Sequence, residues 1–442
     1  MYLTKYIESV ANLIRERSVL IRIARGASWN MLGVIVYRGM SIISLIIAAR
    51  LIGTKGFGEL GITLDTVTMF QIFAGLGLGL TATKYVAELK NQNPRRAGRI
   101  IGLSRIIALA TGSLCSIALL IFSPWICSVI LAAPELVEIF RIASLLLFFS
   151  AINGYQVGVL TGLEAFKVIA IINILIGIIG LPLIVIFVMW WGVKGAILGL
   201  AVSVSFNLIL NTFALREQLH KAGIVVDNTF ECFREKSALW NFSLPAALSG
   251  FMVTPAIWIC DAILVNTRNG YQEMGVFTAA NQWRMAILFL PNVLSAVILP
   301  FLANLLGENN RPKYKVVLKY SLLFNTGIAS VGAVLVILFV PIIILLYGKG
   351  FSDSKIVFII LSLSTILTAL NSVIGQTIVS SGRVWYSFLF NLLWASALVF
   401  LAKLFIPLKG AQGFAYAFLG SYVLHSMWQS LYLIRILKYK AT

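Results

Sequence analysis

The sequence predicts an all-α integral membrane protein, with twelve transmembrane helices arranged as two parallel six-helix lobes around a central cleft. The 442 residues are 60% hydrophobic and only 12% charged, whereas soluble domains carry about 25% charged residues. Apolar runs recur at lengths that can cross a bilayer core about 30 Å thick. Short motifs of the first half also recur in the second half at a nearly constant spacing.

Apolar runs of spanning length form two sets of six, separated by the longest polar connection in the chain. The first set is 28–50, 60–83, 101–122, 139–162, 168–191 and 195–215, and the second is 238–265, 274–304, 316–340, 356–380, 384–406 and 411–434. We therefore expect an N-terminal lobe over 1–217, a cytoplasmic interlobe linker over 218–237 and a C-terminal lobe over 238–442.

The two sets of spans are copies of one unit. The segment 56–61 (GFGELG) returns as 270–275 (GYQEMG). Asn153, Asn173 and Gly195 return 218 residues later as Asn371, Asn391 and Gly413. Because six spans is an even number, both copies enter the membrane in the same direction, so the repeats are parallel. Two such lobes facing across a cleft are the architecture of an alternating-access transporter.

The distribution of Lys and Arg predicts the orientation in the membrane. With the N-terminus inside, 24 of the 35 basic residues lie in cytoplasmic segments and nine in outer loops, and the other two are Arg38 and Arg284 within spans. Both termini are therefore expected to be cytoplasmic. The net charge of +19 then indicates topology and contact with anionic lipid, not a nucleic-acid partner.

Residues that could support an enzyme or a metal site are scarce. The two histidines are His220, in the linker, and His425, on the last span, and the four cysteines have no CxxC or Cys/His metal spacing. No Ser/His/Asp set or phosphate-binding loop is present. We expect no enzyme, no catalytic residue and no metal site, and we favour a helix-packing hydrogen bond over proton relay for His425.

Four ionisable residues within spans are the candidate functional residues: Arg38, Asp65, Asp261 and Arg284. A charge at bilayer depth costs about 2.5–3.5 kcal/mol, so each must face protein or a wet cavity. In a structural interpretation, Arg38 pairs with Asp65 and Arg284 with Asp261. In a functional one, the arginines line the cleft and bind an anion, while an acid, Asp65 before Asp261, couples transport to Na⁺ or H⁺. Asp261 also lies near an outer helix end, where a solvated acid is an alternative.

Several segments resemble the polysaccharide-biosynthesis flippases, which move lipid-linked O-antigen repeat units. They are AARLIGTKGFGELGI and GLGLTATKYVAEL in the first half, and FTAANQWRMAILFLPNVLSAVILPFLANL, which contains Arg284, in the second. GLEAF at 162–166 and SSGRVWY at 380–386 are similar to loops of the same family. That family belongs to the larger multidrug, oligosaccharidyl-lipid and polysaccharide exporter group, and the resemblance covers essentially the whole chain.

The resemblance implies a bacterial inner-membrane protein that carries an undecaprenyl-pyrophosphate-linked oligosaccharide from the cytoplasmic to the periplasmic leaflet. We expect the lipid-linked glycan and membrane lipid as partners, polysaccharide-assembly proteins as candidate partners that the sequence does not decide, and no cofactor apart from a coupling Na⁺ or H⁺. Guanidinium groups suit a pyrophosphate because they bind phosphate bidentately. Two other hypotheses compete with it: a cation-coupled multidrug or small-molecule antiporter of the same superfold, and a membrane enzyme of glycan assembly. The short outer loops disfavour the enzyme.

Overall fold

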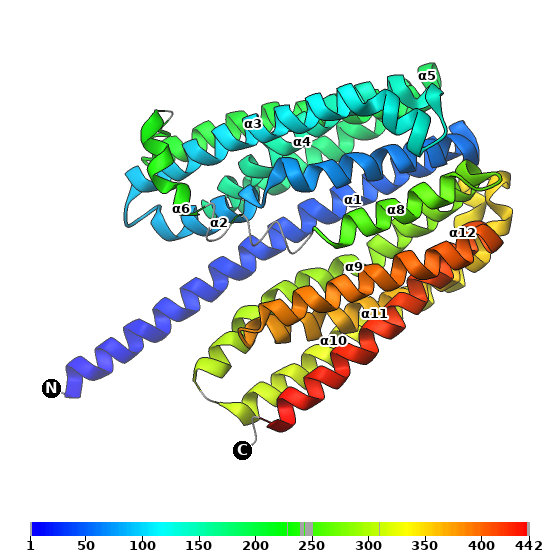
Figure 1. Ribbon diagram of the computed structural model, residues 1–442. Coiled ribbons are helices and arrows are strands. Elements are labelled where there is room, and N and C mark those ends of the chain that lie inside the picture. The colour runs from blue at the N-terminus through cyan, green and yellow to red at the C-terminus, as the bar shows by residue number, and fades with distance from the viewer. Residues whose placement is uncertain (1, 228, 239–242, 244–250, 309, 440–442) are drawn as a thin grey trace. The chain divides into compact units, whose positions relative to one another are not determined.

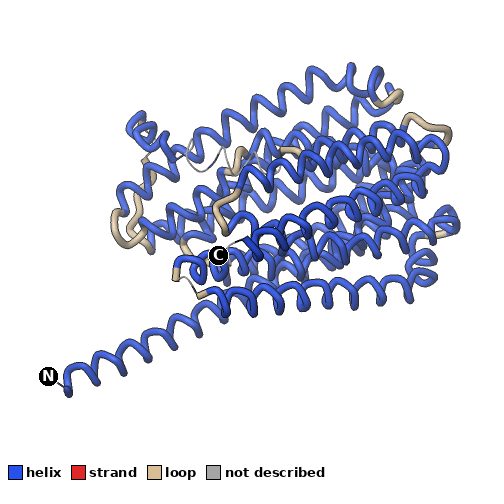
Figure 2. The backbone as a smooth tube through the Cα atoms, turned by 60° about the horizontal axis from the view of Figure 1, so that its bottom comes forward, coloured by secondary structure: helices blue, strands red, loops and turns tan. Residues whose placement is uncertain are grey.

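The computed structural model describes residues 2–439 except 228, 239–242, 244–250 and 309, and the described residues form helices and short connections without a strand (Figures 1 and 2). The α-helices are α1 (Tyr2–Gly75), α2 (Leu78–Leu89), α3 (Pro94–Trp125), α4 (Val137–Gly162), α5 (Phe166–Lys221), α6 (Lys236–Ala238), α8 (Val253–Val265), α9 (Gly270–Gly307), α10 (Arg311–Tyr347), α11 (Lys355–Ser380) and α12 (Val384–Tyr439). The shorter elements are η1 (Ile126–Ile130), η2 (Pro134–Leu136), η3 (Phe230–Glu235) and η5 (Lys349–Ser354).

Three of the long helices are each two spans joined at a kink. The backbone leaves helical geometry at Gly53 in α1, at Gly192 in α5 and at Gly410 in α12, with φ values of 73°, 56° and 53°. Glycine reaches this left-handed region without the steric cost that a Cβ atom imposes. The chain therefore reverses direction within what is otherwise continuous helix.

The kinks in α5 and α12 confirm the duplication. Gly192 and Gly410, one repeat apart, have nearly the same ψ, −130° and −128°. Three residues later, Gly195 and Gly413 both lie against the carbonyl oxygen of a phenylalanine in the preceding helix. A Cβ atom there would approach that oxygen to 1.8 and 2.0 Å respectively. The motif that recurs in the sequence is thus a recurring helical hairpin.

The described helices agree with the predicted spans. The halves of α1, α5 and α12, together with α3, α4, α9, α10 and α11, occupy eleven predicted span positions in the described part of the chain. Helix α8 covers the end of the remaining span, predicted at 238–265, in which 239–242 and 244–250 lie outside the described residues. Within the described residues, six helical segments are long and apolar enough to cross a membrane, and three of them contain two spans each. The chain is a multi-pass integral membrane protein, and the all-α fold class is confirmed.

The chain packs as two compact units. Unit 1 consists of Met1–Leu45, Phe70–Ile121 and Arg141–Ala247, and unit 2 of Ile46–Met69, Phe122–Phe140 and Leu248–Thr442. Two segments of the first half of the chain thus pack with the second half. Most of the segment 218–237 packs with unit 1. The lobe boundaries at 217 and 238 stay a prediction.

Each unit has its own apolar core. In unit 1, α2, α3, α4 and α5 contribute buried residues such as Val86, Ile100, Val159 and Ile172. In unit 2, α11 packs against α9, α10 and α12, and α8 packs against α9 and α12 (Figure 1). These packed helices hold the ionisable residues of unit 2 in place.

Candidate functional site

Arg284 lies in α9 of unit 2 and is held by aromatic and neutral polar groups. Its guanidinium carbon is 4.7 Å from the centre of the Phe418 ring and 5.8 Å from that of Tyr422, both on α12. One terminal nitrogen donates to the Asn281 Oδ1 atom at 3.2 Å and the other to the Tyr422 hydroxyl at 3.3 Å. The side chain is only 3% exposed, so cation–π contacts replace much of the lost hydration.

No carboxylate among the described residues forms a salt bridge with Arg284. Its Nε atom is buried and has no hydrogen-bond partner in the described part of the chain. The pairing with Asp261 that the structural interpretation expected is therefore wrong, because Asn281 on α9 and the aromatic residues on α12, rather than α8, supply the partners of the guanidinium. The cation keeps unused hydrogen-bonding capacity, which an anion could take up.

Asp261 lies in α8 and is 0% exposed. Both of its carboxyl oxygens are buried without a partner among the described residues. The alternative of a solvated acid near a helix end is therefore wrong, because the turn that carries Asp261 is covered by the helices packed around it. A buried carboxyl group without a partner is costly and calls for an explanation in terms of function.

Asp65 lies in the second half of α1, also in unit 2, and is partly buried. Its helical turn packs against α8 near the turn that carries Asp261. The adjacent Thr66 accepts a hydrogen bond of 2.8 Å from the indole nitrogen of Trp258, one turn before Asp261. The structure thus brings together two acids that the sequence separates by almost 200 residues.

Arg38 lies in the first half of α1, in unit 1, with an exposed side chain. Its pairing with Asp65 and its contact with a substrate stay predictions. Of the four candidates, the structure groups Asp65 with Asp261. It places Arg284 in separate, aromatic surroundings on α9 and α12.

The recurring motif forms a close helix crossing that sequence reasoning did not identify. A Cβ atom on Gly58 of α1 would lie 1.9 Å from the carbonyl oxygen of Tyr271 at the start of α9. One on Gly275 would lie 2.0 Å from the carbonyl oxygen of Thr54. The two copies of the motif therefore pack backbone to backbone within unit 2, as small residues allow. The signal that could have predicted it is a glycine in each copy, Gly58 and Gly275, although Gly58 aligns with Gln272 and so is not part of the shared spacing.

The family models agree with this architecture. The model described as polysaccharide biosynthesis protein matches residues 23–306, and the MatE model matches residues 245–402. The first match includes Arg38, Asp65, Asp261 and Arg284.

Curated relatives align along most of the chain. The EPS I polysaccharide export inner membrane protein EpsE of Ralstonia nicotianae is 23% identical over 405 residues, covering 89% of each chain. The lipid III flippase of Escherichia coli is 21% identical and covers 91% of this chain and 96% of its own. A putative O-antigen transporter of Escherichia coli is 26% identical over 74% of this chain and 76% of its own. By name these are an exporter, a flippase and a transporter, which agrees with the prediction that the chain is not an enzyme.

Solved structures share the fold. An inward-facing multidrug resistance transporter of the MATE family superposes with a TM-score of 0.73 at 16% identity, over 93% of this chain and 100% of its own. A transporter of the MOP superfamily from Pyrococcus furiosus superposes with a TM-score of 0.70 at 19% identity, over 95% of this chain and 96% of its own. Since the polysaccharide biosynthesis model covers well over half of the sequence, the chain belongs to the polysaccharide biosynthesis protein family.

Proposed function

We propose that this protein is a flippase that moves a lipid-linked oligosaccharide across the membrane by alternating access between its two repeats. The observation that carries the proposal is a buried guanidinium, Arg284, that has no carboxylate partner in the described chain. It lies in a membrane protein whose relatives are named for polysaccharide export, lipid III flipping and O-antigen transport. Such a cation suits the phosphate groups that join a glycan to its lipid.

The substrate we propose is an undecaprenyl-pyrophosphate-linked glycan. Its headgroup carries several negative charges and a hydrated glycan, so it crosses the bilayer core unaided only at a prohibitive free-energy cost. Arg284 would bind the pyrophosphate through charge-assisted hydrogen bonds, each worth roughly 1.5–3 kcal/mol. The assignment of Arg38 to substrate binding stays a prediction from the sequence. The isoprenoid tail would remain in the lipid throughout.

We assign the coupling of transport to the carboxyl groups of Asp65 and Asp261. The turns of the two acids pack together, and the oxygens of Asp261 are buried without a described partner. Two neighbouring acids in an apolar interior favour binding a proton or a small cation. Binding and release of that ion would favour different arrangements of the helices that carry the two acids. Either Na⁺ or H⁺ fits this chemistry.

We place the protein in the bacterial inner membrane with both termini in the cytoplasm, on the distribution of its basic residues. Single cysteines introduced at Lys55, Arg268 or Lys349 should then react with an impermeant maleimide added from the periplasm. Cysteines at Arg96 or Lys313 should not react. Strong periplasmic labelling at Arg96 would contradict the orientation.

Deletion of the gene tests the function directly. The deletion strain should accumulate one lipid-linked oligosaccharide in the cytoplasmic leaflet, and wild-type protein should clear it. Arg284→Gln, matched to wild type in membrane protein level, should not. A strain that accumulates no such lipid but becomes sensitive to cationic drugs would instead support a cation-coupled multidrug antiporter. Glycan-assembly proteins recovered with the flippase would identify its partners.

A further inference from the structure

The segment after α5 lies directly on α3 within unit 1. The backbone nitrogen of Asp227 donates to the carbonyl oxygen of Gly98 at 3.3 Å. A Cβ atom on Gly98 would lie 2.0 Å from the carbonyl oxygen of Val225, and one on Gly102 would lie 1.8 Å from that of Asp227. The two glycines are one helical turn apart. Because neither has a side chain, the backbone of this segment packs directly against α3 at both positions.

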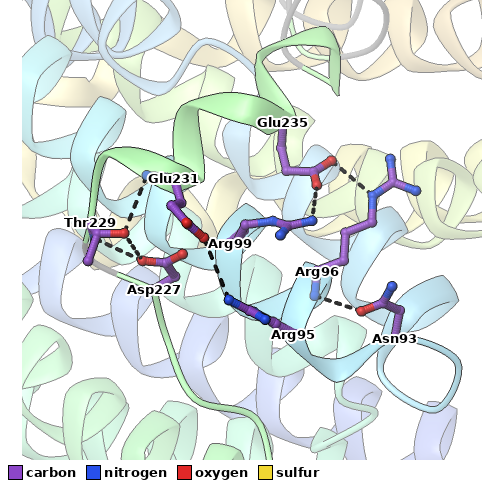
Figure 3. Close-up of polar contacts among 8 residues, drawn as sticks. All are labelled: Asn93, Arg95, Arg96, Arg99, Asp227, Thr229, Glu231 and Glu235. Carbon is purple, nitrogen blue, oxygen red and sulfur yellow. Dashed lines mark hydrogen bonds and ion pairs between the residues drawn. The ribbon is translucent and has the colours of Figure 1, made fainter.

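Glu235 fastens the other end of the segment to the same helix (Figure 3). Its carboxylate accepts from Arg96 Nε at 2.9 Å and from Arg99 Nη2 at 3.0 Å. Glu235 is 5% exposed, whereas 43% of the Arg96 side chain and 20% of the Arg99 side chain are exposed, so the acid is shielded from water while its two partners are only partly shielded. One buried carboxylate therefore bridges two arginines of α3.

A second ion pair lies nearby and is much more exposed to solvent. Arg95 and Glu231 are 3.8 Å apart, with 82% and 44% of their side chains exposed. Exposed pairs of this kind contribute little to stability. Glu231 therefore offers a matched control for Glu235, since it is the same residue type in the same short helix, η3.

Apolar side chains complete the attachment. Ile224 packs into the core formed by α2, α3, α4 and α5. Cys232, between Glu231 and Glu235, is 0% exposed. The side chain of Thr229 accepts from the backbone nitrogen of Glu231 at 3.3 Å and so caps η3 at its start. Backbone, charges and apolar side chains thus all tie the segment 224–235 to unit 1.

We propose that residues 224–227 and 229–235 form a strap that stays fixed to unit 1 throughout transport, so that this part of the connection between the two repeats does not move relative to α3. The strap itself follows from the contacts in unit 1, whereas its consequence for transport rests on the proposed flippase function. With the strap fixed to α3, the free length of chain between the two repeats is shorter than the polar segment in the sequence. Without the strap, that free length increases by the whole strap.

Cys232 is a native reporter of the strap. In protein with Cys115, Cys127 and Cys260 replaced by Ala, we expect a maleimide added to inverted membrane vesicles to label Cys232 at least about tenfold more slowly than a cysteine at the exposed Glu217. Glu235→Gln should raise the rate about tenfold or more, because it leaves two guanidinium groups without their shared acid. Glu231→Gln should change it less than about twofold.

Gly98→Ala provides a second variant, since it displaces the strap while leaving Glu235, Arg96 and Arg99 in place. It too should raise the Cys232 labelling rate and lower transport several-fold at equal protein level. If Cys232 is labelled rapidly when the strap is unaltered, either at rest or during transport, the strap does not stay fixed to unit 1 and the proposal is wrong. Exposure of Cys232 with full transport would overturn its role in the connection. Because labelling needs no substrate, failure of the flippase proposal would leave the labelling result unaffected.

Discussion

Two buried acids, Glu235 in unit 1 and Asp261 in unit 2, differ in whether their carboxyl groups have partners in the described chain. Glu235 bridges two arginines of α3 at 2.9 and 3.0 Å. Asp261 is buried more completely, yet its two carboxyl oxygens have no hydrogen-bond partner in the described chain. Both residues remove a carboxyl group from water, but only Glu235 receives compensating bonds.

The difference separates a structural charge from a functional one. A buried charge with partners fixes the position of a segment. Removing one residue of such an ion pair leaves the others buried without a partner, which destabilises the fold. An uncompensated charge lowers the stability of the fold, so its retention has to be explained by what it binds. The two sites should therefore respond in opposite directions when the acid is neutralised.

The largest expected effect is the loss of transport in Asp261→Asn. The amide cannot release a proton or bind a cation as the carboxylate does, so transport should fall to background, and Asp65→Asn should act the same way. Because Asp261 has no described partner, the folded amount in the membrane should stay equal to wild type or rise. Glycan clearance per molecule, with thermal unfolding in detergent, measures both quantities.

Arg38→Gln combined with Asp65→Asn serves as the control for the structural interpretation. If Asp65 only pairs with Arg38, the double variant should recover what each single change loses. Such a recovery would refute the coupling role assigned to the acids.

Arg284→Gln should reduce transport about ten- to a hundredfold, corresponding to the loss of one or two charge-assisted hydrogen bonds. The residue has neutral partners, so its removal should leave the protein folded. Arg284→Lys should recover activity only in part, because an ammonium lacks the planar fork of a guanidinium. The measurement is surface polysaccharide normalised to membrane protein. A stable, fully active Arg284→Gln protein would exclude this residue from substrate binding.

The sequence predicted the duplication and the membrane spans because both depend on local patterns. Apolar length determines a span, and the hairpin kinks are fixed by glycines at Gly192 and Gly410, whose backbone conformation only glycine adopts readily. The four ionisable residues were also predictable, since a charge within an apolar run is conspicuous. The partners of those residues were not predictable.

Which groups an ionisable residue contacts depends on the rotation of its helix and on which segments pack against it. The turns that carry Asp65 and Asp261 lie close together because a segment of the first half packs in unit 2, which no local pattern encodes. Arg284 lies on Phe418 and Tyr422 rather than near Asp261 because of how α12 is turned toward α9. The strap could have been suspected from the pair Gly98 and Gly102, whose spacing is typical of close backbone packing.

Glu235→Gln should destabilise the fold where Asp261→Asn does not. Breaking a fully buried ion pair costs about 3–5 kcal/mol. Arg96 and Arg99 are partly exposed, and solvent screening should reduce the loss in the free energy of unfolding to about 1–3 kcal/mol. Glu231→Gln should cost no more than about 0.5 kcal/mol. If the Glu235→Gln and Glu231→Gln variants have the same free energy of unfolding, the buried ion pair contributes no more to stability than the exposed one.

The smallest expected effect concerns a third acid, Asp227, which is partly exposed in the strap. The Thr229 hydroxyl and backbone nitrogen donate to one Asp227 oxygen at 2.6 and 2.9 Å, and these bonds hold the pKa of Asp227 below its usual value. A lowered pKa means that the bonds contribute fully above the ordinary carboxyl pKa and are lost as the pH falls through the lowered value. Amide hydrogen exchange in 229–235 should therefore become less protected in acid, by a small factor. Asp227→Asn keeps an acceptor oxygen but cannot titrate, so its exchange protection should no longer vary with pH in this range. If the variant retains the acid-dependent loss, a different group controls this turn, and the charge of Asp227 has no part in securing the strap.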